Sequence, residues 1–456
     1  MPAMSPIETR ATFSLASLFA LRMLGLFMIL PVFAIYGTEL EGASELLIGL
    51  AIGAYGLTQA MLQVPFGLAS DRFGRKPVII AGLVIFCLGS LLAALSDNIY
   101  GVIAGRALQG AGAIASAVMA LLSDLTTDEN RTKAMATVGA SIGVSFSIAL
   151  VLGPIVAGWF GVSGLFWMTA VLALAGILVV IWVVPTPIAK RKHRDSRPVL
   201  GEFSDAFKNF ELLRLDFGVF LLHMTLTASF VVVPVVLVDR LQIANVDHWQ
   251  LYLPVMVISF ILMIPLMIVA EAKRKIREVF LLAIVLLGSA LLGLAIWHQA
   301  LWQMVIGLLV FFWAFNLLEA MLPSLVSKIA PAGSKGTSMG VYSGSQFFGA
   351  FVGGVGGGYL HGAFGPYQVF MVCGLLAFIW LIVAYGMKQP RFLQSYRFDI
   401  TQHSQEDTEE LLDRLLAVEG VEEAVVIMEE RAAYLKVDRK RFDQAVLVET
   451  MQPMSA

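Results

Sequence analysis

The sequence GLASDRFGRK, residues 67–76, joins two stretches that carry no charged side chain, 46–70 and 77–96. About 20 apolar residues in a helix are enough to cross a hydrocarbon core of about 30 Å. A short loop of one acid and three bases between two such stretches is typical of a tight turn at a membrane–water boundary. The segment therefore predicts two consecutive membrane helices joined by a charged loop.

The same pattern extends outward over most of the chain, which is 58% hydrophobic and only 14% charged, with a mean hydropathy of +0.81. Soluble domains carry about 25% charged residues, so a soluble protein is excluded. Apolar stretches predict about twelve spans in two six-helix halves: 12–37, 46–70, 77–96, 99–123, two in 134–189, 217–238, 248–270, two in 279–327 and two in 336–387. Breaks are expected in 158–164, around 298–299 and near 361–366. The body is therefore expected to be an all-α membrane protein.

Basic residues gather in alternate loops. One face would carry Arg72, Arg75, Lys76, Arg131, Lys133, the bases of 190–197 and 273–277, Lys328 and Lys335, whereas the other has only Arg240. Loops rich in Lys and Arg are retained in the cytoplasm. Both termini are therefore expected in the cytoplasm.

These patterns divide the chain into 1–185, a six-helix bundle; 186–211, a cytoplasmic linker; 212–388, a second six-helix bundle; and 391–456, a small cytoplasmic domain. From Arg391 onward there are 14 acids and 8 bases. Strand patterns near 397–400, 424–428 and 433–437 and helix patterns at 408–418 and 439–448 give the order βαββα. This order predicts a ferredoxin-like α+β domain.

The pattern of Gly67, Asp71, Arg72, Gly74, Arg75 and Lys76 closely resembles the signature loop of the major facilitator superfamily, with Ala69 where a Leu is common. The resemblance implies a twelve-helix transporter in which this loop stabilises the outward-facing arrangement. It also implies that Asp71 faces the start of helix eleven, near Gly336 and Thr337, and that Arg75 pairs with Asp124. The alternative is a solvated turn whose charges only fix the orientation.

Two further segments resemble motifs of this superfamily. Arg106, in the segment 105–110, resembles the helix-four motif, although a fixed structural ion pair is an equal alternative. Gly153, Pro154 and Gly158 resemble the helix-five motif of antiporters, with Ala157 in place of one glycine. Together they imply the drug:proton antiporter branch, found in the bacterial inner membrane.

Glu319 is the only carboxylate that the expected spans place deep in a membrane helix. Desolvation disfavours the charged form of such a group, so Glu319 is a candidate proton carrier. His223 is a possible companion, because helices seven and ten line the cavity in the family that the chain resembles. A nearby Arg22 or Arg106 would instead make Glu319 part of a static ion pair, and a contact with a substrate cation is a third possibility.

The leading hypothesis is export of hydrophobic or amphipathic compounds by alternating access, driven by inward proton flow. Uptake of a specific solute, or a sensor or scaffold acting through the C-terminal domain, are the alternatives. No phosphate-binding loop and no metal-ligand spacing is present in the sequence, so neither an enzyme, a cofactor nor a metal is expected. The expected partners are a small-molecule substrate, protons and the lipid bilayer, without nucleic acid, and the protein is expected to be a monomer.

Overall fold

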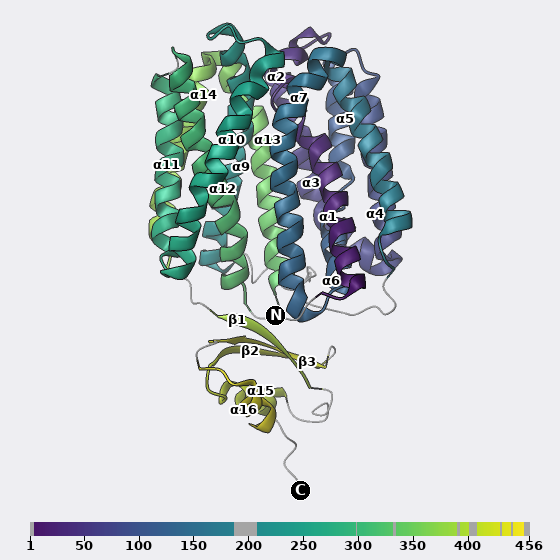
Figure 1. The fold of residues 1–456 in the computed structure, drawn as a ribbon, viewed down its shortest axis with the longest axis vertical. Coiled ribbons are helices and arrows are strands. Elements are labelled where there is room, and N and C mark those ends of the chain that lie inside the picture. Colours follow the sequence, from purple (N-terminus) through teal and green to yellow (C-terminus); the bar gives the residue numbers. More distant parts are fainter. Residues whose placement is uncertain are drawn as a thin grey trace.

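The protein is described here by a computed structural model with a helical body and a small α/β domain at one end (Figure 1). The residues that the structure describes are 4–186, 208–297, 299–331, 334–389, 393–400, 408–428, 431–438 and 441–450. Most of the expected linker, 186–211, lies outside the described residues.

The first half of the body contains α1 (Pro6–Phe27), α2 (Phe33–Tyr36), the turn η1 (Gly37–Glu39), α3 (Glu45–Phe73), α4 (Arg75–Ala94), α5 (Ile99–Ala111), α6 (Ala115–Asp124), α7 (Asp128–Leu178) and the π-helical turn η2 (Val179–Val183). The second half contains α9 (Phe210–Asp239), the turn η5 (Asn245–Asp247), α10 (His248–Ala272), α11 (Ile276–Ile296), α12 (Leu301–Ile329), α13 (Lys335–Phe364) and α14 (Pro366–Tyr385).

The number of membrane-length segments agrees with the sequence prediction. Among the described residues, 10 helices are long and apolar enough to cross a membrane. One of these, the 51-residue segment Lys133–Val183, consists of two segments joined at a kink at Gly161. The 30-residue α13 is long enough but rich in glycine, which lowers its mean hydropathy. Twelve membrane-length segments result, and the breaks expected in 158–164 and near 361–366 lie at Gly161 and Gly365.

Two helix boundaries differ from the prediction. The first span was expected at 12–37, but α1 begins at Pro6, where Ser5 and Glu8 form a capping box, and ends at Phe27. The fourth span was expected as one helix over 99–123, but it is interrupted at 112–114, between α5 and α6. The absence of charged residues indicates neither where a helix is capped nor where it is interrupted. The start of α1 and the break between α5 and α6 were therefore not predicted.

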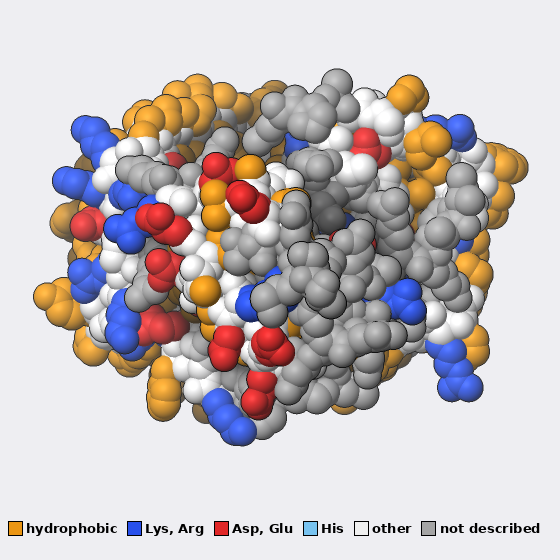
Figure 2. All heavy atoms as spheres, turned by 90° about the horizontal axis from the view of Figure 1, so that it is seen from below, with side chains coloured by type: hydrophobic (Ala, Val, Ile, Leu, Met, Phe, Trp, Pro, Cys, Tyr) orange, Lys and Arg blue, Asp and Glu red, His pale blue; other side chains and the backbone are white. Residues whose placement is uncertain are grey.

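We call the end of the body next to the small domain the proximal end; it carries Gly74, Asp124 and Ile329, whereas Glu45 and Gly365 lie at the distal end (Figure 1). Seen from the small-domain side, acidic and basic side chains are interspersed on the face, and hydrophobic side chains border it (Figure 2). Exposed apolar side chains around a bundle fit a body surrounded by lipid.

The two halves pack most closely near the distal end, where glycines of α3 face glycines of α13. A Cβ atom at Gly49 would lie 2.2 Å from the carbonyl oxygen of Gly354, and one at Gly53 would lie 2.7 Å from that of Phe351. Only glycine permits such close backbone approach. The structure is therefore closed at the distal end.

The small domain contains β1 (Gln394–Asp399), α15 (Thr408–Leu416), β2 (Val421–Ile427), β3 (Ala432–Val437) and α16 (Gln444–Thr450). Its sheet has the order β1-β3-β2, with β3 antiparallel to both neighbours. This split βαβ arrangement is that of a ferredoxin-like fold, as predicted. The helices α15 and α16 lie on the side of the sheet away from the body (Figure 1).

Candidate functional site

The loop between α3 and α4 turns at Gly74, whose φ of 98° is a conformation that side-chain-bearing residues rarely adopt. The turn brings the Arg75 guanidinium next to two carboxylates, with Nη1 2.5 Å from Asp71 Oδ1 and Nε 3.0 Å from Asp124 Oδ2. Arg75 Nη1 also donates to the Ser70 hydroxyl at 2.6 Å. The Arg75 and Asp124 side chains are only 7% and 5% exposed, so this is a buried ion pair between the start of α4 and the end of α6.

The remaining residues of the loop have separate roles. Lys76 Nζ donates to the carbonyl oxygen of Val184 at 2.6 Å and so links the loop to the end of the first half. The Arg72 guanidinium lies 5.5 Å from the centre of the Phe73 ring, and Gly67 is buried. The loop is thus joined to the end of α6 and to the end of the first half.

Arg22 lies fully buried inside the first half. Its Nη2 donates to Gln59 Oε1 at 2.8 Å and to the carbonyl oxygen of Gly112 at 2.9 Å. The rings of Phe86 and Tyr55 lie over its guanidinium, at 5.6 and 5.9 Å. The break between α5 and α6 frees the Gly112 carbonyl to accept this hydrogen bond, so the unpredicted interruption serves the buried arginine.

Arg106 lies in the same half and is also buried. Its Nη1 donates to Gln109 Oε1 at 2.8 Å, and its Nε donates to the carbonyl oxygen of Ala51 at 3.2 Å. Tyr55 lies over both guanidinium groups. Neither Arg22 nor Arg106 forms an ion pair with a described carboxylate, so amides, carbonyls and aromatic rings stabilise both charges instead.

Glu319, on α12, meets residues of two other helices of the second half. Its Oε2 lies 3.6 Å from His223 Nε2 of α9, and its Oε1 accepts a hydrogen bond from Gln346 Nε2 of α13 at 3.4 Å. Gln346 Nε2 also lies 2.8 Å from His223 Nε2. We call Glu319, His223 and Gln346 the carboxyl–imidazole cluster. Sequence reasoning missed Gln346, whose only signal was a polar side chain within an apolar, glycine-rich stretch.

The two ring nitrogens of His223 have different neighbours. His223 Nδ1 lies 3.2 Å from the carbonyl oxygen of Val219, and Nε2 faces the Gln346 amide nitrogen. A neutral ring with its proton on Nδ1 can donate to Val219 and accept from Gln346. A proton added to Nε2 would repel the amide nitrogen and favour donation to Glu319. The cluster can therefore adopt two hydrogen-bonding arrangements that differ by one proton.

Two observations differ from the expected burial of carboxylates. The Glu319 side chain is 38% exposed, so it is not deeply buried as the sequence predicted. Asp216, on α9, is only 7% exposed and lies within a membrane-length helix. Sequence reasoning missed Asp216 because the charge-free stretch 217–238 begins one residue after it.

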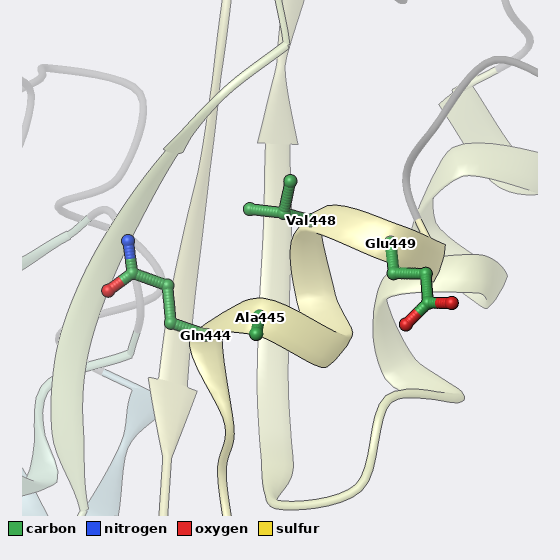
Figure 3. Close-up of a pocket in the computed structure, with 4 residues that line it drawn as sticks. All are labelled: Gln444, Ala445, Val448 and Glu449. Carbon is green, nitrogen blue, oxygen red and sulfur yellow. The ribbon is translucent and has the colours of Figure 1, made fainter.

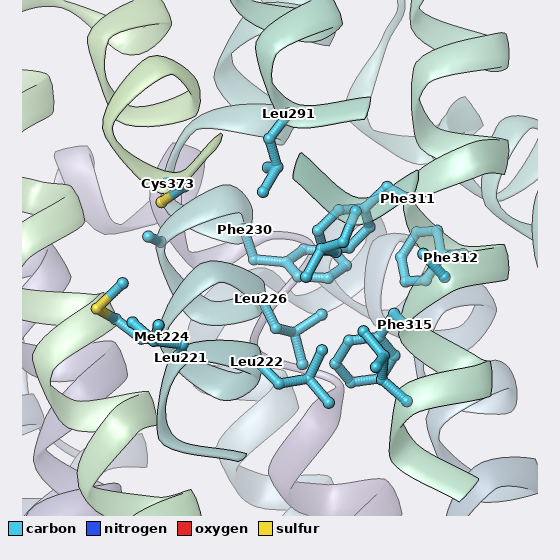
Figure 4. Packing of buried hydrophobic residues seen from close by; sticks show 14 of the residues in the cluster. Leu221, Leu222, Met224, Leu226, Phe230, Leu291, Phe311, Phe312, Phe315 and Cys373 are labelled. Carbon is cyan, nitrogen blue, oxygen red and sulfur yellow. The ribbon is translucent and has the colours of Figure 1, made fainter. Parts of the chain in front are cut away.

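Aromatic rings from both halves gather beside the carboxyl–imidazole cluster. Phe146 of α7 lies 6.3 Å from Phe230 of α9 and 6.2 and 6.4 Å from Phe312 and Phe315 of α12. Figure 4 shows the rings of Phe230, Phe311, Phe312 and Phe315 between α9 and α12. The centre of the Phe315 ring is 5.9 Å from that of His223. The polar cluster thus borders an aromatic contact between the halves.

The helix-five motif lies in α7, where close packing requires the glycine at position 153. A Cβ atom at Gly153 would lie 2.5 Å from the carbonyl oxygen of Met28, and Pro154 follows inside the helix. A Cβ atom at Gly158 would lie 3.4 Å from the Val246 side chain of η5, in the other half. The motif therefore contacts both α1 and the second half.

Two recesses in the described surface lie elsewhere. One is lined by Gln444, Ala445, Val448 and Glu449 of α16 (Figure 3), and the other lies beside the kink of α7, near Trp159 and Trp167. Within the described ranges, no group of three His, Cys, Asp or Glu side chains could hold a metal ion.

Comparison with known families gives two matches. Residues 15–275 match the Major Facilitator Superfamily, and residues 397–451 match the YajR YAM domain. The chain is 51% identical over 437 residues to the inner membrane transport protein YajR of Escherichia coli (strain K12), and the match covers 96% of each chain. It is 41% identical over 392 residues to an uncharacterized transporter of Buchnera aphidicola subsp. Schizaphis graminum, covering 85% of this chain and 99% of that one.

Solved structures with low sequence identity share the fold. A bacterial homologue of the human lysosomal transporter Spinster, in an inward-facing and unoccupied conformation, gives a TM-score of 0.67 at 14% identity, covering 84% of this chain and 98% of that one. The human organic anion transporter MFSD10 (TETRAN) gives a TM-score of 0.61 at 18% identity, and the match covers 83% of this chain and 100% of that one.

Proposed function

Because this chain belongs to the major facilitator superfamily and is a multi-pass inner-membrane transporter, we propose that it exports hydrophobic or amphipathic compounds in exchange for protons. The proximal end faces the cytoplasm in this proposal, so that both termini are cytoplasmic. The distal end, which the structure has closed, then faces outward.

The carboxyl–imidazole cluster is the observation that carries the proposal. It joins α9, α12 and α13, and its hydrogen bonds change when a proton is added to His223 or Glu319. An ionisable group inside a membrane helix is costly and most often functional. Glu319 can therefore carry a proton, and its protonation would change the hydrogen bonds that join α9, α12 and α13. Coupling of protons to alternating access requires such a link between protonation and helix packing.

The aromatic contact between the halves supports a hydrophobic cargo. Phe146 meets Phe230, Phe312 and Phe315 across the boundary between the halves, next to the cluster. Aromatic faces bind apolar surfaces and cations without fixing one chemical structure. A compound that separates these rings would also disturb His223, which packs on Phe315.

The test is transport by the full chain in liposomes with an imposed pH gradient, using ethidium as a hydrophobic cation and 1-anilinonaphthalene-8-sulfonate as an amphipathic anion. A trapped pH indicator reports the proton flux. We expect Glu319→Gln to lose proton-driven transport of the probe but to keep exchange of probe for probe at equal pH. Glu278→Gln, at an exposed carboxylate on α11, is the matched control and should behave as the unaltered protein.

Normal proton-driven flux in Glu319→Gln would exclude Glu319 as the coupling carboxylate. Uptake of probe along with protons, in place of exchange, would favour the importer alternative.

A further inference from the structure

Asp216 is a buried carboxylate that has no role in the proton coupling proposed for Glu319. It lies on α9, about 9 Å along the helix from Phe210 at 1.5 Å per residue, and so between the proximal end and the carboxyl–imidazole cluster. It shares a face of α9 with Val219 and His223, because residues three, four and seven apart align on a helix. Within the described residues it has no ion-pair partner.

Tyr342 is a second buried ionisable side chain in this part of the second half. It lies on α13 one turn before Gln346, is 4% exposed, and interacts electrostatically with both Glu319 and Asp216. Its hydroxyl oxygen has no hydrogen-bond partner among the described residues. A buried hydroxyl without a hydrogen-bond partner costs free energy, which a bound water molecule can offset.

The depths of these groups form a series. Counted from the proximal ends of their helices at 1.5 Å per residue, Asp216 lies at about 9 Å, Tyr342 at about 10 Å and Glu319 at about 15 Å. The neighbouring chain is otherwise apolar, since Val219, Leu215 and Leu222 are all buried. Asp216 and Tyr342 thus lie at similar depths, between the proximal end and Glu319.

We propose that Tyr342 and Asp216 form the route by which the proton of Glu319 reaches the proximal end, with Asp216 as a second proton-binding site. The inference rests on the proposed proton coupling at Glu319. Because the distal end is closed in this structure, the arrangement corresponds to the stage at which the proton is released proximally.

The transfer moves one proton and no electrons. Glu319, as a carboxylic acid, gives its proton through a water molecule to the Tyr342 oxygen. Tyr342 gives its own hydroxyl proton to the Asp216 carboxylate. Glu319 ends as a carboxylate, Tyr342 is unchanged, and Asp216, now a carboxylic acid, loses the proton to water at the proximal end.

The other charges near this route are already engaged. Arg214, on the same helix, pairs with Glu211 at 2.6 Å. From α14, Trp380 packs against Gly218 and brings no charge. From α12 and α13 the ionisable groups are Glu319 and Tyr342 themselves, together with Lys328, which pairs with Glu271 at 2.8 Å, Lys335 at the proximal start of α13, and Tyr359 and His361 towards its distal end. Asp216 is therefore free to change its protonation without breaking an ion pair.

The experiment compares Asp216→Asn and Tyr342→Phe in the liposome assay with a trapped pH indicator and ethidium. We expect proton flux to slow by about 100-fold in both, the scale of losing one positioned proton-transfer group, while ethidium-for-ethidium exchange at equal pH is retained. Asp216→Glu should restore most of the flux. The matched controls are Asp239→Asn, at the exposed distal end of α9, and Tyr359→Phe, at an exposed position of α13.

A second measurement does not depend on any transported compound. Infrared difference spectra over a pH titration of the purified protein should contain a protonated-carboxyl band that Asp216→Asn removes, separate from the band that Glu319→Gln removes. Normal proton flux in both variants, or no band assignable to Asp216, would overturn the route while leaving coupling at Glu319 intact. Normal proton flux in Glu319→Gln would instead overturn the proposed function.

Discussion

The Nζ atom of Lys436, in the small domain, lies 3.1 Å from the carbonyl oxygen of Lys328 and 3.5 Å from that of Ile329. These carbonyls end α12, where unpaired oxygens and the helix dipole favour a cation. Lys436 is 3% exposed and also pairs with Glu423 at 3.4 Å. It extends from the face of β3 opposite α15, as do the buried Ala432 and Tyr434, so the small domain contacts the body through this face.

The 14 acids and 8 bases after Arg391, next to basic loops of the body, predict that acids of the small domain dock on those loops. The Lys436 contact has the opposite polarity, because here a base of the small domain meets carbonyl oxygens of the body. Because Lys436 is buried, salt should screen the contact only weakly, even at about 1 M, where the Debye length is about 3 Å. We expect Lys436→Met to release the domain, since a hydrogen bond to a charged group contributes about 1.5–3 kcal/mol. Distances between spin labels on α15 and α11 would measure the release.

The control for this variant is Arg441→Met, at an exposed position of the small domain. Release of the unaltered domain by salt alone would mean that exposed charges, not Lys436, hold it in place.

Deletion of the chain from residue 391 should leave the helical body folded. The apolar core of the small domain, which includes Leu411, Leu415 and Leu435, is separate from the apolar clusters of the helical body. We expect the truncated protein to insert and to elute as one monodisperse species, with a thermal transition close to that of the full chain. Aggregation of the truncated protein would show that the small domain is needed for folding.

The sequence predicted the features that depend on local composition. Long apolar stretches, and glycines at 161 and 365, were sufficient for the span count and two breaks, because a membrane helix needs continuous apolar length wherever it packs. The order of strands and helices after residue 393 was readable for a similar reason: alternation along each strand is local.

Features that depend on contacts between distant segments of the chain could not be predicted from the sequence. The interruption at Gly112 is explained by Arg22, which lies far away in the sequence and donates a hydrogen bond to the carbonyl oxygen that the break frees. The polar partners of Glu319 come from α9 and α13, so the sequence could not say that its side chain would be 38% exposed. Asp216 lies just outside a charge-free stretch, so its burial could not be predicted from that stretch.

The loop between α3 and α4 allows two substitutions with different consequences. The Asp71 side chain is 26% exposed, so Asp71→Asn should impair transport through loss of a state-specific contact while the thermal stability changes little. Arg75→Gln should also lower the stability, by about 3–5 kcal/mol, because the buried Asp124 carboxylate would lose its ion pair with Arg75. Transport assays and thermal unfolding of the purified variants separate the two effects.

Asp97→Asn, at an exposed position of the distal end, is the control for the loop variants. Full transport activity in Asp71→Asn would contradict a role for this carboxylate in switching.

The contact between α3 and α13 leads to a prediction about the conformational equilibrium. A Cβ atom at Gly354 would lie 2.5 Å from the carbonyl oxygen of Gly49 and 2.8 Å from the amide nitrogen of Gly53, whereas one at Gly356 would meet nothing within 4 Å. Both glycines lie in the same helix, so they share the same intrinsic helix propensity. Gly356→Ala is therefore a control that differs from Gly354→Ala in tertiary contact alone.

We expect Gly354→Ala to oppose closure of the distal end, because overpacking at a backbone contact costs about 1–3 kcal/mol and only the closed state makes that contact. The ratio of distal-closed to distal-open molecules should fall by about 5- to 150-fold. Spin labels at Glu39 and Gln299, one on each half at the distal end, would report this as a population with longer distances. An unchanged distance distribution in Gly354→Ala, or the same shift in Gly356→Ala, would mean that these glycines do not form the distal closure.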